Sequence, residues 1–129
     1  MKIKTPISVG ELLDKISILK IKSFKIKDEE KLKNVKLELE YLNNIAKEKL
    51  SKYENLEKRS EELYQVNASL WNIEDQIRVA EKRKDFDSEF IFLARSVYIT
   101  NDKRFDIKNK INEECGSELK EEKSYEKYS

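Results

Sequence analysis

Residues 8–19, SVGELLDKISIL, carry the signals that decide the fold. Ser8 and Glu11 have the spacing of a capping box, in which the Ser8 hydroxyl accepts from the Glu11 amide and the Glu11 carboxylate reaches back. After this start the apolar residues recur at helical spacing and form a broad apolar face. The sequence therefore predicts an amphipathic helix over residues 8–27.

Asp28 opens a second helical segment, because Asp is a favoured N-cap and the two Glu residues after it suit the positive end of the helix dipole. No Gly or Pro follows until after residue 84. One helix of that length would measure about 85 Å, too long for a compact domain. We expect a turn at Ser51, which begins another S-x-x-E box, and helices over residues 28–50 and 52–84. A long, partly exposed antiparallel coiled coil is the alternative.

Asp87 restarts the chain as an N-cap, and Gly116 marks a left-handed helix end, so a fourth helix is expected over residues 88–115. The resulting fold class is all-α, an antiparallel bundle of four main helices in a single domain. The remaining segments are an N-terminal arm and a C-terminal tail, residues 1–7 and 117–129.

The composition excludes several classes of protein. The 129 residues include only two Gly and one Pro, too few for the turns of a sandwich or barrel. There is no His and no glycine-rich phosphate loop, so we expect no imidazole chemistry, no metal and no cofactor. The charges nearly cancel, with 27 Lys and Arg against 26 Asp and Glu, which argues against a nucleic-acid partner. The lone Cys115 and the lack of a long apolar stretch predict a cytoplasmic protein without a membrane partner.

A group of polar residues interrupts the apolar stripe of the fourth helix. The tight turn near Phe86 makes the last two helices antiparallel neighbours, so residues equally distant from position 86 face each other. This register brings the only Trp and three of the five Arg to one level of the bundle. The candidate site comprises Trp71, Glu74, Asp75, Arg78, Arg95, Tyr98, Asn101, Asp102 and Arg104.

Three interpretations of this group stay open. It can be a partly buried ion-pair network that sets helix register, with Trp71 filling the core. It can bind an anionic or carboxylated small molecule, held by Arg side chains and stacked on an aromatic ring. Paired acids can also catalyse, as the all-helical chorismate mutases do without His, but no motif of that family is present. We assign no catalytic residue.

The leading functional prediction is a non-enzymatic module that associates with a helical protein partner or with itself. Well-sorted amphipathic helices with short loops make good association surfaces. On the first helix, Ile18 and Ile21 widen the apolar face beyond what one neighbour covers. A homodimer is therefore expected.

The C-terminal tail is predicted to return across the bundle instead of fraying. Tyr125 would pack by its ring and bond by its hydroxyl. Glu121 and Glu122 would approach basic side chains, with Arg95 and Arg104 as the first candidates. Exposed ion pairs contribute only about 0–1 kcal/mol each, so the docking would depend mainly on the apolar contacts.

Two strings, LWNIEDQIR at residues 70–78 and EEKSY at residues 121–125, resemble an uncharacterised bacterial family. The similarity extends over nearly the whole chain, including the opening helix and the last one. It implies a compact all-helical protein of unassigned function and carries no known chemistry. The residues that match the family signature are Trp71, Glu74, Asp75, Arg78, Arg95, Tyr98, Asn101, Asp102 and Glu121 to Tyr125.

Overall fold

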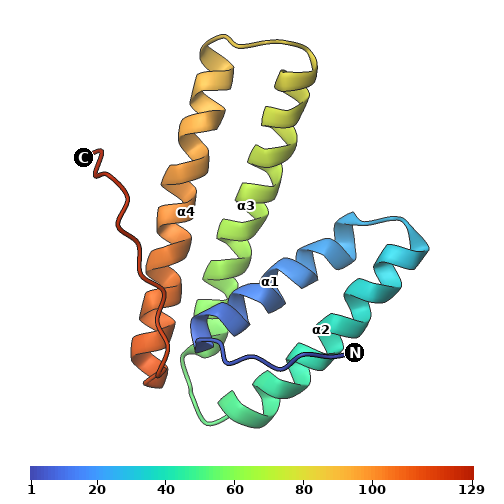
Figure 1. Cartoon of the computed structure of the whole chain (residues 1–129), viewed down its shortest axis with the longest axis vertical. Helices are drawn as coiled ribbons and strands as arrows, with labels where there is room; N and C mark the ends of the chain where they lie inside the picture. The colour runs from blue at the N-terminus through green and yellow to red at the C-terminus, as the bar shows by residue number, and fades with distance from the viewer.

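A computed structural model describes all 129 residues and contains four helices and no strand (Figure 1). This confirms the predicted all-α fold with four main helices. The helices are α1 (Val9–Lys25), α2 (Glu29–Leu50), α3 (Leu56–Lys82) and α4 (Ser88–Cys115).

Four helix boundaries form as their capping signals predict. The side chains of Ser8, Asp28 and Asp87 each accept a hydrogen bond from a backbone amide in the first turn of the following helix. Gly116 ends α4 with a φ of 60°, a left-handed conformation that glycine adopts without steric cost. Local capping is therefore sufficient to place these helix ends.

The prediction that Ser51 caps the third helix is wrong. Ser51 instead follows the last residue of α2, and α3 begins at Leu56 after Asn55, which makes no side-chain capping bond. The five-residue turn between the helices is held by Tyr53, whose hydroxyl donates to the backbone carbonyl of Cys115 at 3.2 Å. Because the chain turns here, α2 and α3 are not one continuous helix.

The four helices form two hairpins, and the α1–α2 hairpin lies across one end of the α3–α4 hairpin (Figure 1). The backbone of α1 approaches all three other helices, whereas that of α2 approaches only α1. The core accordingly forms around α1. Its buried side chains are Leu12, Leu13, Ile16, Leu50, Leu56, Leu63, Ile107 and Ile111.

The broad apolar face of α1 is covered within one chain. Leu12, Ile16, Leu19 and Ile21 are all buried, and Ile18 is half-buried. Three neighbouring helices account for the width of this face, so it no longer indicates a second copy.

The α3–α4 hairpin has the register that symmetry about residue 86 predicts, since Arg59 and Glu114 form an ion pair at 2.7 Å. The upper part of this hairpin extends beyond α1 (Figure 1). We call residues 72–99 the distal hairpin and the remainder of α3 and α4 the proximal half. Leu93 is the only buried residue of the distal hairpin.

Candidate functional site

A cleft of about 420 Å³ lies where α1 meets α3 and α4, and six of the nine predicted site residues line it. We call it the junction cleft. α1 contributes two isoleucines, and α3 and α4 contribute the polar side chains. Its lining consists of Ile18, Ile21, Asn67, Leu70, Trp71, Glu74, Asp75, Arg78, Asn101 and Arg104.

The other three predicted residues lie outside the junction cleft. Arg95 is exposed and forms no ion pair. Tyr98 and Asp102 contact the C-terminal tail, where the Tyr128 hydroxyl donates to Asp102 Oδ2 at 2.6 Å and its ring packs edge-on against Tyr98 at 5.1 Å. This hydrogen bond raises the pKa of Tyr128 above its usual value. The two residues therefore hold the tail and do not line the cleft.

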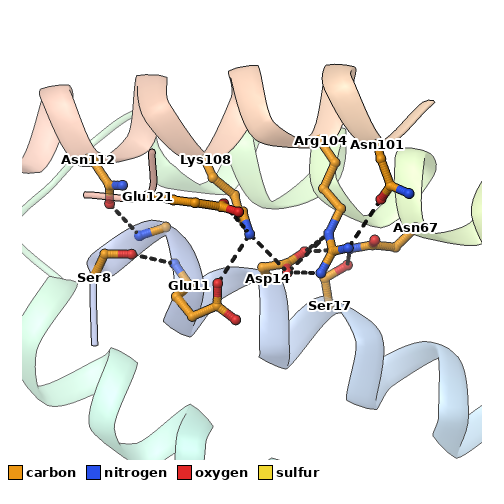
Figure 2. A network of polar contacts seen from close by, with 11 residues as sticks. Ser8, Glu11, Asp14, Ser17, Asn67, Asn101, Arg104, Lys108, Asn112 and Glu121 are labelled. Carbon is orange, nitrogen blue, oxygen red and sulfur yellow. Dashed lines mark hydrogen bonds and ion pairs between the residues drawn. The ribbon is translucent and has the colours of Figure 1, made fainter. Parts of the chain in front are cut away.

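A buried acid that the sequence prediction missed binds two of the residues that line the cleft, Asn67 and Arg104 (Figure 2). Asp14 on α1 is completely buried, and its Oδ1 accepts from Asn67 Nδ2 at 2.8 Å. Arg104 forms a two-bonded fork with the same carboxylate, through Nε to Oδ1 at 3.0 Å and through Nη2 to Oδ2. The hydrogen bonds to Asp14 raise the pKa of Arg104 above its usual value. A fully buried carboxylate is thus compensated by charge and by hydrogen bonds.

Lys108 is a second buried charge in this network (Figure 2). Its Nζ lies 3.1 Å from a Glu11 carboxylate oxygen, 2.7 Å from one of Glu121 and 3.7 Å from one of Asp14. Burial alone would lower the pKa of Lys108, but the hydrogen bonds to Glu121 and Glu11 and the charge of Asp14 raise it overall. The Glu11 carboxylate therefore binds Lys108 on α4. It does not reach back to the Ser8 amide, so only the first bond of the predicted capping box forms.

A stripe of small and polar residues on α1 makes this packing possible. Gly10, Asp14 and Ser17 recur at helical spacing and are all buried. A Cβ on Gly10 would lie 2.7 Å from the backbone carbonyl oxygen of Lys108, so only glycine allows this approach to α4. The spacing of this stripe is the signal by which the sequence could have indicated Asp14.

The tail returns along α4, but not with the predicted contacts (Figure 1). Glu121 pairs with Lys108 instead of Arg95 or Arg104, because Asp14 already occupies the Arg104 fork. The prediction for Tyr125 is wrong, since that side chain is 81% exposed and forms no hydrogen bond.

The predicted contact for Glu122 does not form either, as this side chain is exposed and has no ion pair. Tyr128 takes the role expected of Tyr125, through both its ring and its hydroxyl. The tail is therefore attached through Ser117, whose Oγ accepts from the Val9 amide at 3.2 Å, and further along through Glu121 and Tyr128.

The junction cleft combines fixed donors with an aromatic wall. Asp14 uses Nε and Nη2 of Arg104, so the Nη1 donors are left with one long contact to Asn101 Oδ1 at 3.4 Å. Arg78 pairs with Glu74 at 3.4 Å on the exposed rim. Nowhere in the chain do three His, Cys, Asp or Glu side chains gather in a way that could hold a metal ion.

The fold and this cleft define an all-α protein of two helical hairpins joined by a buried polar network. None of the four helices is both long enough and apolar enough to cross a lipid bilayer. The profile of a family of unknown function (DUF6165) matches residues 1–128, and the chain belongs to this family. No curated protein and no solved structure matches the chain. The expected membership of an uncharacterised family is thereby confirmed at the level of the family.

Proposed function

We propose that the protein is a non-enzymatic helical interaction module that binds a lysine-rich segment with an aromatic anchor on its distal hairpin. This hairpin has apolar side chains that no other part of the chain covers. Four of them are about half exposed or more, namely Val79 at 47%, Phe86 at 53%, Ile91 at 57% and Phe92 at 62%. Uncovered apolar side chains that cluster on one element are typical of association surfaces.

The observation that carries the proposal is a groove of about 420 Å³ on this hairpin, which we call the distal groove. Its apolar lining comes from both helices and consists of Val79, Ala80, Phe90 and Leu93. Four carboxylates and one guanidinium surround this lining, those of Asp75, Asp85, Asp87, Glu89 and Arg83. None of the four carboxylates belongs to an ion pair. An apolar groove with an acidic rim suits an aromatic side chain flanked by cations.

A short synthetic peptide with one Phe between pairs of Lys tests this proposal. Titrated into the protein, it should shift the amide resonances of residues 75–93 and leave those of the proximal half unchanged. Binding should weaken steeply with salt, because the attraction is between exposed charges. The matched control peptide replaces each Lys by Glu and should not bind. Shifts spread over the whole chain, or equal binding of the two peptides, would contradict the proposal.

A second candidate function is binding of a small carboxylate or phosphate in the junction cleft. The specific support is the fork between Asp14 and Arg104, which holds the guanidinium still and leaves its Nη1 donors beside the cleft. The Nη1 donors can form charge-assisted hydrogen bonds to an oxygen of a carboxylate or phosphate. Trp71 lines the same cleft and could stack on an attached ring.

A thermal-shift screen with carboxylic acids, phosphates and sugar nucleotides tests the second candidate. A ligand present at 100 times its dissociation constant should stabilise the fold by about 2.7 kcal/mol. Trp71 is the only tryptophan, so the same ligand should change the intrinsic tryptophan fluorescence. A screen in which neither the melting temperature nor the fluorescence responds would remove this candidate.

A further inference from the structure

We infer that the partner of the distal groove is a second copy of this chain, which inserts Phe24 from the end of its α1. The inference rests on the proposed function of that groove and names its occupant. Phe24 is 78% exposed, more than any other large apolar side chain in the four helices.

The surroundings of Phe24 carry more lysines than acids. Four lysines lie within four residues of it in the sequence, namely Lys20, Lys22, Lys25 and Lys27, against the single acid Asp28. None of them forms an ion pair with a carboxylate of its own chain. We call residues 20–27 the basic tip. It presents one aromatic side chain among four ammonium groups.

The basic tip and the distal groove are complementary in charge and in polarity. The groove has an apolar lining and four carboxylates without ion pairs, and the tip has one apolar ring and four free ammonium groups. The two surfaces do not meet within one chain, because no residue of α1 lines the distal groove. Figure 1 shows the same separation, since α1 ends well away from the connection between α3 and α4.

Reciprocal exchange between two copies uses this contact twice. With two-fold symmetry, each copy donates its tip and receives the tip of its partner, so the assembly closes as a dimer. A single exposed aromatic contact scarcely offsets the entropy lost on association, and the repeated contact doubles the gain. We therefore expect a dimer with a dissociation constant in the micromolar range that dissociates more readily as salt is added.

Charge exchange in the full-length chain tests this inference. One variant reverses the groove with Asp75→Lys and Asp85→Lys, and the other reverses the tip with Lys20→Glu, Lys25→Glu and Lys27→Glu. All five positions are exposed and none is a helix cap, so both variants should fold. Each variant alone has tip and groove of the same sign. In an equimolar mixture of the two, both contacts between unlike copies join opposite signs.

Sedimentation equilibrium should show wild-type dimers and a dissociation constant raised at least about thirtyfold for each variant alone. The mixture should associate again within about threefold of wild type. Phe24→Ala should weaken the dimer at least about a hundredfold, since two buried rings are lost. The matched control is Lys33→Glu with Lys36→Glu on the exposed face of α2, which should dimerise like wild type.

A wild-type chain that stays monomeric up to millimolar concentration would overturn the inference. So would a dimer whose charge-reversed variants do not recover on mixing. If the chain is monomeric but the Lys–Phe peptide still shifts residues 75–93, the second copy is wrong and the proposed function stands. If neither the peptide nor a second copy binds there, both fail.

Discussion

The two ends of the α3–α4 hairpin differ in how far their side chains are buried. In the proximal half, Leu63 and Ile111 are completely buried and the charged residues form a closed network. In the distal hairpin only Leu93 is buried, and apolar side chains face solvent. The difference lies in α1, which packs against the proximal half and reaches only the base of the distal hairpin, at the junction cleft.

Two arginines make the same comparison at the level of single ion pairs. Arg104 in the proximal half has a side chain 26% exposed and is paired with a completely buried acid. Arg78 in the distal hairpin is 77% exposed and pairs with a Glu that is 44% exposed. Exposed pairs contribute about 0–1 kcal/mol, whereas breaking a buried pair costs about 3–5 kcal/mol. An arginine ion pair therefore stabilises the fold in the proximal half and contributes little to stability in the distal hairpin.

Asp14→Ala should show the largest effect. It leaves Arg104 and Lys108 without their shared buried acid, so the free energy of unfolding should fall by about 3–5 kcal/mol in urea titrations. The matched control is Asp75→Ala, an exposed acid of the distal hairpin, which should change stability by less than about 0.5 kcal/mol. Equal effects of the two substitutions would break the comparison between the halves.

Amide hydrogen exchange should separate the two halves without any substitution. Few buried contacts hold the distal hairpin, so its backbone can open locally while the proximal half stays folded. We expect amides of residues 73–80 and 91–97 to exchange at least about a hundredfold faster than those of residues 104–111. Uniform protection along α4 would show that the hairpin unfolds as a single unit.

Deletion of residues 117–129 should have a smaller effect. It removes the Glu121–Lys108 ion pair and the Tyr128–Asp102 hydrogen bond on α4, and the hydrogen bond from the Val9 amide of α1 to Ser117 Oγ. We expect a loss of about 1–2 kcal/mol, which lowers the melting temperature by several degrees. Tyr125→Ala is the control within the tail and should leave the melting curve unchanged, because that side chain is exposed.

The smallest predicted effect is an alkaline loss of stability. The ordinary pKa of Lys108 is 10.5 and folding raises it, so its stabilising contribution is present below that value and is lost as pH rises through the folded-state pKa. The loss should appear above about pH 10.5. Lys108→Met should flatten this part of the profile relative to wild type. Parallel profiles of the two proteins would show that Lys108 titrates as if it were exposed.

Helix ends could be predicted from the sequence because capping depends on residues at most three apart. Ser8, Asp28 and Asp87 cap in place, and each contact is local. Ser51 has the same S-x-x-E spacing as Ser8 but lies at the C-cap of α2, and Tyr53 in the same turn is bonded to the distant end of α4. The pattern alone could not reveal that tertiary contact.

The candidate site was predictable only where the α3–α4 hairpin determines it. Symmetry about the turn brings Trp71 and Asn101 into one cleft. It also placed Arg95 at the same level, but it does not fix which way a side chain points around the helix, and Arg95 faces solvent. Asp14 lies on α1, 90 residues before Arg104 in the sequence, so no rule of local spacing connects the two residues.

Because α1 packs against all three other helices, its contacts can be completed only late in synthesis. Asp14 and Arg104 are 90 residues apart in the chain. At about 5–20 residues per second, a ribosome makes the arginine roughly 5–18 s after the aspartate. In that interval α1 can pair with α2, but the acid has no guanidinium beside it. The first helix to leave the ribosome, α1, can complete its contacts only after α4 has been made. A nascent chain that stops before residue 104 lacks the positive charge that compensates the buried Asp14.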